Sequence, residues 1–488
     1  MNSTVFKRLL IGVALLALPL LGGCATAPAT GKTIFTGGLN EEAEAELGRK
    51  EHDKILKQFG GAYDDPALAA YIGSLGRLLA KTSELADREF TFTVLDTPTV
   101  NAFALPGGYV YVTRGLLALA ENEAEVAGVL AHEIGHVTAR HAAERYGDAV
   151  TATALNLGVA ILLGGQAAHA TSGLSQIVLR GFSRDQEFEA DTLGVRYLSR
   201  TGHDPKAMAT FLSKLQAHSR LQATLAGRPG AADEFSLLQT HPRTADRVEQ
   251  AIRQAATRQV RDPVVARDIY LRKIDGMLYG DNPEHGMIRG RRFAHPKLGF
   301  VFDVPEGFRL INSAKAVIAR GPEGAAILFD GVRKKGSGPI RAYLTESWGK
   351  SLALRDVETL RINGLEAATG RAQVDTRRGR FDVRLVAFDF DAESIYRFIF
   401  ITPPNLTAGL SRGLRDTTYS FRRLGEAEAK AYPPLRLRLA KVRQGDTAAA
   451  IAKRMPFDDY RLERFLVLNG LSSASALRAG QTVKIVTD

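Results

Sequence analysis

Two histidines four residues apart are the clearest sign of chemistry in this 488-residue chain. His132 and His136 enclose Glu133 in the pattern His-Glu-x-x-His, within a segment of helical periodicity. Residues at this spacing project from one face of a helix, so the two imidazoles can share a metal ion. Zinc suits imidazole nitrogen, and a catalytic zinc site uses three protein ligands and leaves one position for water. Glu133 then lies beside that water as a general base. The alternative is a charged helix face without a metal.

A second, acidic segment offers carboxylates for the same site. Residues 183–191 read Ser-Arg-Asp-Gln-Glu-Phe-Glu-Ala-Asp and follow a capping pattern for a helix. Glu187 and Asp191 are four apart and share a face of that helix. The chemistry requires one carboxylate as third ligand and another to hold the far N–H of a ligand histidine, which fixes its tautomer. The alternative is a solvated acidic surface, to which we expect Glu189 to belong.

Helices and a small sheet must hold these side chains in place. The pattern predicts a helix that begins near Glu123 and carries His132 and His136, and another that Ser183 caps. We expect His141, one turn and one residue beyond His136, to be exposed rather than to act as a ligand. Further predicted elements are helices over 40–59 and 65–82, a strand over 89–95, and a hairpin over 101–113 that turns at Pro106-Gly107-Gly108. This region is therefore predicted to be mainly helical.

Four stretches together resemble a known family. They are His132-Glu133-x-x-His136, residues 183–191, Thr240-His241-Pro242, and the run Val100-Asn101-Ala102-Phe103-Ala104-Leu105-Pro106-Gly107-Gly108. The combination resembles the HtpX/BepA/CAAX-prenyl-protease family of membrane-associated gluzincins, which are zinc metallopeptidases with a His-Glu-x-x-His helix. The resemblance covers about residues 30–255. The C-terminal part differs from that of the bacterial members, because it has no tetratricopeptide pattern.

The resemblance implies a role for each residue at the metal. His132, His136 and Glu187 would bind one zinc ion per chain, and Asp191 would stand behind a ligand histidine. Glu133 would take the proton of the zinc-bound water as it attacks the scissile carbonyl, and would then pass a proton to the leaving amine. The site would thus cleave peptide bonds.

The resemblance also implies two features around the metal. His241 would lie near the zinc, either as a donor to the transition state or as a latch on the open position. The hairpin would flank the cleft, where an extended substrate can add as a strand. The residues expected to receive it are Asn101, Ala102, Phe103 and Ala104.

The N-terminus has the pattern of an export signal. Lys7 and Arg8 precede an apolar stretch over 9–21, which is too short to cross a bilayer as a permanent helix. Leu21-Gly22-Gly23-Cys24 resembles the bacterial lipobox, so we predict a signal peptide over 1–23, a lipid on Cys24 and a tether over 24–39. Ala25 in place of aspartate favours the outer membrane, facing the periplasm. The alternative is a secretory signal with a chance cysteine.

Composition limits the remaining possibilities. Hydrophobic residues at 45% and charged residues at 24% indicate a folded protein, and the length predicts two to four domains. The net charge of +11 comes from scattered arginines without interleaved aromatics, which favours anionic partners such as lipid head groups and argues against nucleic acid. Because Cys24 is the only cysteine, no intrachain disulfide can form.

The C-terminal half divides at Tyr432-Pro433-Pro434. Strand-rich residues 291–425 carry no catalytic pattern; their opening weakly resembles PsbP-like α/β sandwiches, and we expect an accessory role in binding partners or substrates. Residues 438–488 resemble a LysM module, which folds as two helices on a two-stranded sheet and binds the N-acetylglucosamine chains of peptidoglycan. However, Ala448-Ala449-Ala450 replace the larger residues usual after the Gly-Asp-Thr turn, so a purely structural module remains the alternative to glycan binding.

The sequence thus predicts a multidomain α+β protein with a protease domain over 40–260. The leading hypothesis is a lipid-anchored zinc endopeptidase of the bacterial envelope that cleaves misfolded or stalled envelope proteins, a substrate class implied by the family. Two alternatives remain: a chaperone or assembly factor for outer-membrane proteins, and a peptidoglycan-binding scaffold with structural zinc. The intact Glu133 and the open three-ligand site favour catalysis.

Overall fold

The computed structural model divides into two compact units. It describes residues 23–162, 181–232, 241, 244–313, 316–334, 336, 338–376 and 379–488. Unit 1 holds residues up to Lys57, Gly61–Met277 and Arg436–Thr487, and unit 2 holds mainly Leu278–Leu435. The predicted signal peptide lies outside the described residues except for Gly23. Within the described part of the chain, no helix has the length and apolarity to cross a membrane.

A three-stranded sheet forms one side of unit 1, in the order β3 (Thr91–Leu95), β5 (Tyr109–Thr113), β4 (Ala102–Leu105). The hairpin predicted from sequence is present, with Ala102 opposite Val112 and Leu105 opposite Tyr109. Its turn uses Gly107 and Gly108, both with positive φ (83° and 90°), a conformation that glycine adopts without steric cost. Strand β4 is left at the edge of the sheet.

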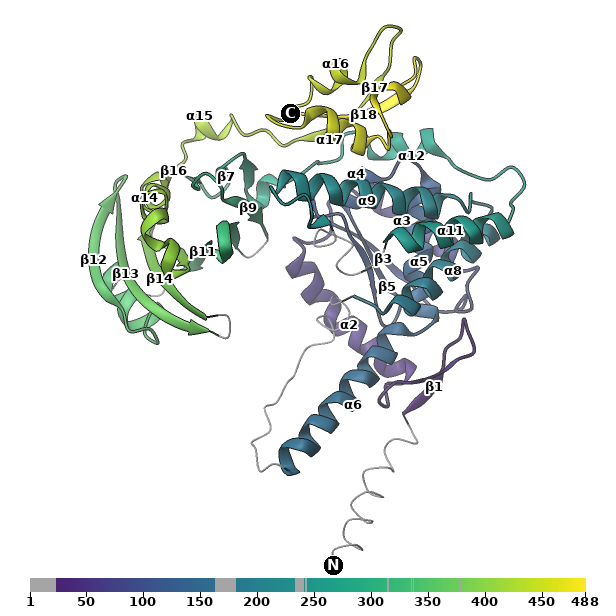
Figure 1. Ribbon diagram of the computed structural model, residues 1–488, viewed down its shortest axis with the longest axis horizontal. Coiled ribbons are helices and arrows are strands. Elements are labelled where there is room, and N and C mark those ends of the chain that lie inside the picture. Colours follow the sequence, from purple (N-terminus) through teal and green to yellow (C-terminus); the bar gives the residue numbers. More distant parts are fainter. Residues whose placement is uncertain are drawn as a thin grey trace, which may run out of the picture. The chain divides into compact units, whose positions relative to one another are not determined.

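The helices of unit 1 surround a central one, α5 (Figure 1). Their bounds are α2 (Glu41–Gln58), α3 (Pro66–Ala80), α4 (Arg114–Leu119), α5 (Glu123–Thr138), α6 (His141–Leu162), α8 (Arg184–Arg200), α9 (Ala207–Leu225), α11 (Thr244–Thr257) and α12 (Arg267–Ile274). Helix α5 packs on α3, α8, α9 and β4, and every residue from Ala124 to Thr138 is buried. A helix buried all round forms the core of its domain. The predicted zinc-binding motif therefore lies on the most enclosed element of unit 1.

Residues predicted as a tether form a packed hairpin. Strands β1 (Cys24–Thr26) and β2 (Thr33–Phe35) pair antiparallel, with Cys24 opposite Phe35. The backbone N–H of Ala29 donates to the carbonyl of Thr138 at the end of α5, at 3.1 Å. At Gly147 in α6, a Cβ atom would lie 2.1 Å from the carbonyl oxygen of Phe35, so glycine is required for this approach. Cys24 itself is exposed.

The predicted LysM fold is present, and it belongs to unit 1. Its elements are β17 (Arg436–Lys441), β18 (Thr482–Thr487), α16 (Ala448–Ala452), α17 (Arg461–Leu468) and the short turn η6 (Ala474–Ala476). Helix α17 packs on α4 and α9. Segment 276–277 pairs with Leu437 through two backbone hydrogen bonds of 2.9 Å. The module thus packs against the helices around α5 and does not form a separate compact unit.

One buried lysine secures this packing. Lys484 of β18 is fully buried, and its Nζ donates to the carbonyls of Ala118 at 2.8 Å and Ala120 at 2.7 Å. It also pairs with Glu121 at 2.9 Å. The last carbonyls of a helix have no partner within it and carry partial negative charge, so a cation is favourable at the end of α4. Lys484 thereby fixes the turn from which α5 begins.

Unit 2 is an antiparallel β structure with one long helix. A seven-stranded sheet has the order β12-β13-β14-β15-β11-β10-β9, and a four-stranded sheet has the order β16-β8-β7-β6. The strands are β6 (Met287–Arg289), β7 (Arg292–His295), β8 (Phe300–Asp303), β9 (Arg309–Asn312), β10 (Val317–Arg320), β11 (Ala326–Arg333), β12 (Arg355–Ile362), β13 (Leu365–Thr376), β14 (Gly379–Asp389), β15 (Ser394–Thr402) and β16 (Arg422–Arg423). The helices and helical turns are η3 (Pro283–His285), η4 (Pro322–Gly324), α13 (Ile340–Ala342), η5 (Tyr343–Trp348), α14 (Pro404–Ser420) and α15 (Glu426–Ala429).

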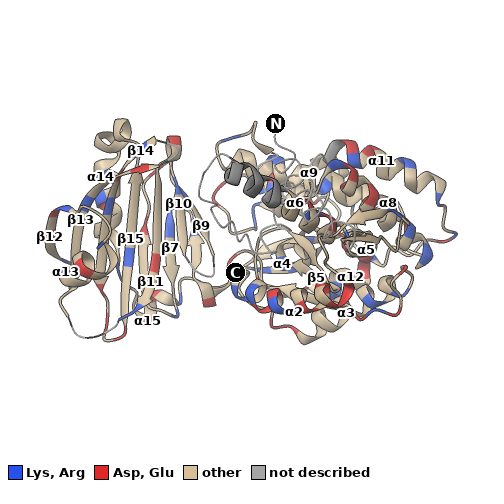
Figure 2. Ribbon diagram, turned by 90° about the horizontal axis from the view of Figure 1, so that it is seen from below, with Lys and Arg blue, Asp and Glu red and all other residues tan. Residues whose placement is uncertain are grey.

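Aromatic side chains fill the core of unit 2. Phe300 and Phe302 of β8 meet Phe329 of β11 and Phe398 of β15, all buried. These residues come from the strand-like runs that the sequence predicted, and aromatic rings of this kind dominate core energetics. Basic and acidic residues are interspersed along the elements of both units (Figure 2).

Replacing Lys484 with methionine is expected to destabilise unit 1. The change keeps most of the side-chain volume but removes the donor to the α4 carbonyls and leaves Glu121 with the charges of Arg267, 2.8 Å away, and the nearby Lys214. Breaking a buried ion pair costs roughly 3–5 kcal/mol, and the remaining arginine places this case at about 3 kcal/mol. Denaturant unfolding followed by helical circular dichroism measures it. Lys453→Met, an exposed position in the same module, serves as the control and should change stability by less than about 0.5 kcal/mol. Equal stability of both variants would contradict this account of the packing.

Candidate metal centre

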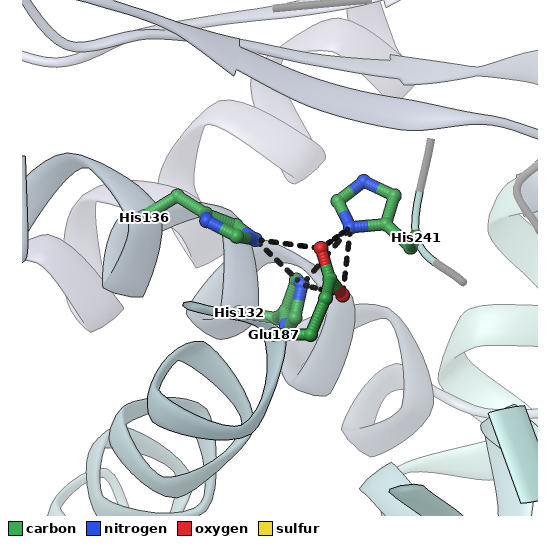
Figure 3. Close-up of side chains that lie close together, drawn as sticks. All are labelled: His132, His136, Glu187 and His241. Atoms are coloured by element: carbon green, nitrogen blue, oxygen red, sulfur yellow. Dashed lines mark hydrogen bonds and ion pairs between the residues drawn. The ribbon is translucent and has the colours of Figure 1, made fainter. Parts of the chain in front are cut away.

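Four buried side chains from three segments converge at one point in unit 1 (Figure 3). His132 and His136 come from α5, Glu187 from α8, and His241 from the residue described just before α11. One ligand atom from each lies within 4.8 Å of all the others. The sequence predicted this set, and the fold brings all four residues together. Thr240 and Pro242 of the same motif lie outside the described residues.

Small residues allow α5 and α8 to approach closely enough for this. At Gly135 of α5, a Cβ atom would lie 3.1 Å from the carbonyl oxygen of Ala190 on α8. At Gly194 of α8, it would lie 3.2 Å from the backbone nitrogen of His132. The capping box of α8, with Ser183 and Gln186 bonded reciprocally as predicted, fixes where that helix begins. Glu187 is consequently delivered to the face of α5 that carries the histidines.

The distances among these atoms fit a small cation. The Nε2 atoms of His132 and His136 are 3.0 Å apart, and each is 3.6 Å from a carboxylate oxygen of Glu187. A tetrahedral zinc with Zn–N bonds of 2.0–2.1 Å separates its ligand atoms by about 3.3 Å. Across such a gap, the lone pairs of the two imidazole nitrogens point at the same space and repel each other. A cation between them removes this repulsion. The donor set of two imidazoles and a carboxylate therefore suits zinc.

Electrostatics keep these ligands in the forms that bind metal. Burial, and then the neighbouring His132, lower the pKa of His136 well below its usual value, which keeps its imidazole neutral. Burial opposes ionisation of Glu187, but His241 and Arg247 outweigh it and hold the pKa of that carboxyl below its usual value. A neutral imidazole and an ionised carboxylate are what zinc requires.

Asp191 lies behind His132, where a carboxylate was expected. Its Oδ1 is 2.9 Å from Nδ1 of His132, so the histidine donates there and directs Nε2 at the metal position. Arg247 of α11 donates two hydrogen bonds of 2.7 Å to Asp191 and forms an ion pair with Glu187 at 2.8 Å. Burial opposes ionisation of Asp191, but Arg247 outweighs it and lowers the pKa of this carboxyl. The arginine thus neutralises part of the charge that the site buries.

Sequence reasoning did not identify Arg247. A usable signal was present, because Arg247, Ala251 and Ala255 follow one another at four-residue spacing and all are buried. An arginine on the inner face of a helix requires a buried anionic partner. The predicted pair of carboxylates on the preceding helix is such a partner.

Glu133 and His241 face each other without completing their hydrogen bonds. Oε1 of Glu133 is 3.6 Å from Nε2 of His241. Among the described residues, Oε2 of Glu133 and Nε2 of His241 are buried without a hydrogen-bond partner. Burial raises the pKa of Glu133, which suits a group that must accept a proton. For His241, burial lowers the pKa, but Glu187 and Glu133 outweigh it and the net shift is upward.

Two expectations about neighbouring residues are wrong. His141 is only 1% exposed, and its Nδ1 lies 2.8 Å from Nδ1 of His136. Glu189 is not simply part of a solvated surface, because it accepts from His141 at 3.2 Å and pairs with Lys32 at 2.8 Å. The helical wheel failed here because α5 ends at Thr138 and a new helix starts at His141. Neither residue belongs to the four-residue metal cluster.

The predicted substrate strand borders the site but is covered. Residues Ala102–Leu105 form the edge strand β4, and the side chain of Asn101 just before it holds a buried Oδ1 with no partner among the described residues. The cavity between β4 and His136 measures about 10 Å³. Phe182 stacks on His136 with ring centroids 3.9 Å apart. In this arrangement all four residues of β4 are buried.

Comparison with known protein families agrees with this geometry. Residues 66–255 match Peptidase family M48, and residues 440–486 match the LysM domain. The chain contains an M48 metallopeptidase domain. The predicted multidomain α+β class, the resemblance to membrane-associated zinc metallopeptidases and the choice of zinc are thereby confirmed.

Curated relatives match the same part of the chain. The Beta-barrel assembly-enhancing protease of Escherichia coli (strain K12) is 35% identical over 237 residues, which is 45% of this chain and 46% of that protein. The Mitochondrial metalloendopeptidase OMA1 of Schizosaccharomyces pombe is 30% identical over 213 residues, covering 42% and 59%. The chain thus spans about half the length of the curated relatives it matches.

Among solved structures, cyanobacterial PsbP from Synechocystis sp. PCC 6803 aligns with 28% of this chain and 98% of its own, at 12% identity and a TM-score of 0.23. A TM-score of this size does not decide a fold. The PsbP-like character of residues 291–425 therefore stays a prediction.

Arg247→Met is expected to destabilise the M48 domain strongly. The substitution leaves Asp191 and Glu187 buried beside each other without their guanidinium, and uncompensated buried charge costs roughly 3–5 kcal/mol. The midpoint of denaturant unfolding, with chelator present to exclude metal effects, measures the loss. Arg253→Met on the same helix removes an ion pair to Glu249 whose side chains are 63% and 74% exposed. That control should change stability by less than about 1 kcal/mol; a matching loss in both variants would contradict the assigned role of Arg247.

Proposed function

We propose that the protein is a lipid-anchored, periplasmic zinc metalloendopeptidase that degrades misfolded or stalled proteins of the bacterial envelope. The observation that carries the proposal is the convergence of His132, His136 and Glu187 around one point, with Glu133 beside it. Three protein ligands plus a general base are what a catalytic zinc site requires. The M48 match over residues 66–255 supports the same reading.

The chemistry follows from the charges around the site. When bound, zinc polarises the scissile carbonyl and lowers the pKa of a water molecule toward 7. Glu133, with its unpartnered Oε2 and raised pKa, accepts the proton of the attacking water and delivers it to the leaving amine. Asp191 and Arg247 keep His132 oriented throughout. His241, whose Nε2 lies 3.6 Å from Oε1 of Glu133, would either donate to the developing oxyanion or latch the site.

An extended substrate would add to the free edge of β4. Strand addition uses the unpaired backbone groups of an edge strand, and β4 has β5 on one side only. Asn101, Ala102, Phe103 and Ala104 would line this position. The orphaned Oδ1 of Asn101 offers an acceptor for a substrate N–H at the start of the strand.

The site as described is closed, which supports a latch. His241 contacts Glu187 at 2.8 Å and thereby occupies the position that a catalytic zinc keeps open. Phe182 covers His136 from the side of β4. Both groups must move before a peptide can reach β4. An enzyme with this resting state would cleave peptides only after His241 and Phe182 move away from the site.

Location and substrates are inferred from Cys24, the LysM domain and the name of a relative. Cys24 is exposed at the start of β1, where a lipid could leave the fold without disturbing it, and Leu21-Gly22-Gly23-Cys24 has the form of a lipobox. The name of the Escherichia coli relative refers to β-barrel assembly, which suggests envelope proteins as substrates. The LysM domain over 440–486 suggests attachment to peptidoglycan. Together they favour an outer-membrane lipoprotein that faces the periplasm.

One observation favours the alternative functions. Four protein side chains close around the metal position, and a site closed by four protein ligands is the usual form of structural zinc. A chaperone or assembly factor for outer-membrane proteins, or a peptidoglycan-binding scaffold, would need only a structural zinc site of this kind. The buried, unpartnered Glu133 argues against this, because a structural site has no use for a base beside its metal.

Glu133→Gln should abolish cleavage while leaving zinc in place. Removing a general base costs about 10²–10⁴-fold in rate, and the substitution preserves size and does not touch a ligand. Casein cleavage by the protein lacking residues 1–24, together with zinc content per chain, tests it. Glu42→Gln, an exposed position in α2, is the matched control. Unchanged turnover in the Glu133 variant would end the catalytic proposal, and absence of zinc from folded wild-type protein would end the metal proposal as well.

His241→Ala should raise cleavage if this residue latches the site. A hydrogen bond to a charged group is worth about 1.5–3 kcal/mol, so its loss is expected to increase the cleaving population about 10- to 100-fold. The initial rate of casein cleavage at saturating zinc measures the change. A fall in rate at full zinc occupancy would instead identify His241 as a donor to the transition state.

A further inference from the structure

A chain of hydrogen bonds runs outward from the second ligand histidine. Nδ1 of His136 is 2.8 Å from Nδ1 of His141, and Nε2 of His141 is 3.2 Å from Oε2 of Glu189. The last member of this series of hydrogen bonds is Lys32 of the N-terminal hairpin. Its Nζ lies 2.9 Å from the same oxygen of Glu189. None of these three outer residues belongs to the metal cluster, so they have no part in the mechanism above.

Only one arrangement of protons satisfies this chain with neutral imidazoles. An ionised carboxylate only accepts, so Nε2 of His141 must carry hydrogen and donate to Glu189. Nδ1 of His141 is then an acceptor, and it takes the Nδ1–H of His136. This leaves Nε2 of His136 with its lone pair directed at the metal position, 3.0 Å from Nε2 of His132.

The two ligand histidines are thus held in the same tautomer by different means. His132 donates directly to Asp191 at 2.9 Å. His136 reaches its carboxylate, Glu189, through His141. An oriented partner for the far nitrogen is a general requirement of histidine ligands, and in this fold an imidazole meets that requirement.

Local backbone strain brings His141 into position. Arg140, between α5 and α6, adopts a left-handed conformation with φ of 55°, which is unfavourable for a residue with a side chain. Its guanidinium is held by Glu44 at 2.6 Å and by the carbonyl of Leu39 at 3.0 Å. The chain turns at Arg140, and α6 begins directly after it with His141 in contact with His136. Strained backbone that is held by contacts from other segments, as Arg140 is by Glu44 and Leu39, occurs most often at functional sites.

We infer that His141 and Glu189 are positioning residues that fix the ring orientation and tautomer of His136, with Lys32 completing the pair from the N-terminal hairpin. The inference rests on the zinc site of the proposed function. His141 contacts the ligand His136 and is expected to contribute most to zinc affinity, and Glu189 acts through His141. Lys32 is expected to contribute least, because its side chain is 61% exposed.

The test is the zinc dissociation constant, measured by competition with a chromophoric chelator on the full mature chain. His141→Leu should weaken zinc binding by about 10- to 100-fold, as for other partners of ligand histidines. His141→Asn should restore part of this loss, because its amide oxygen can accept from His136. Glu189→Gln should weaken binding less than His141→Leu, and Lys32→Met by less than about threefold.

Two controls separate positioning from general stability. His203 is another buried histidine, 2% exposed and 3.4 Å from Glu123, away from the metal cluster; His203→Gln should alter unfolding but not zinc affinity. Asp185→Asn removes an exposed carboxylate from the same helix as Glu189 and should alter neither. Wild-type affinity in His141→Leu, or equal weakening in His203→Gln, would overturn the inference. A wild-type protein that binds no zinc would instead overturn the proposed function.

Discussion

The arrangement of unit 1 depends on burying charge at the crossing of α5 and α8. Glu133, Glu187 and Asp191 are each no more than 1% exposed, and Arg247 is the buried guanidinium that faces them. With all three carboxylates ionised and the imidazoles neutral, as a bound metal requires, three carboxylates and one guanidinium leave two negative charges, −3 + 1 = −2. Buried carboxylates persist only when they are paired or coordinate a metal. A divalent cation held by neutral imidazoles brings the sum to zero, so the metal is a part of the core and not an addition to its surface.

This requirement explains why glycine occurs on both helices at the crossing. Gly135 and Gly194 remove the side chains that would separate α5 from α8, and the resulting approach lets one short carboxylate side chain reach between two histidines. The same close packing excludes water, which strengthens every charge interaction in the site. The cavity between His136 and the Ala104–Leu105 end of β4 is small, about 10 Å³, so little free space remains beside the metal centre there. Any catalytic role therefore requires a moving part, and His241 and Phe182 lie outside the α5–α8 pair that must stay fixed.

Much of this could be predicted from local sequence, for identifiable reasons. The caps at Asn122 and Ser183, the turn at Gly107-Gly108 and the four-residue spacings are local signals, and the corresponding elements are present. Such signals give the face of a helix on which a residue lies but not what covers that face. Glu189 and His141 were therefore assigned to solvent, and Arg247 was missed. His141 was also misplaced by assuming one continuous helix, whereas the left-handed Arg140 resets the direction of the chain. Lys484 gives no local signal at all, since its partners are more than 360 residues away.

The hairpin of β1 and β2 and the LysM module are held at opposite ends of α5. At the start of α5, Lys484 of the LysM module fixes the turn after α4, and at its end the N-terminal hairpin binds the carbonyl of Thr138. The module's sheet contacts α12 through β17 and α17 through β18. The module's loops around Gly445 and Gly480 are exposed and adjacent, since the backbone of Val442 bonds to both Gly480 and Gln481. Packing against the M48 domain and the proposed binding of glycan thus use different surfaces. A structural role for the module does not exclude a binding role.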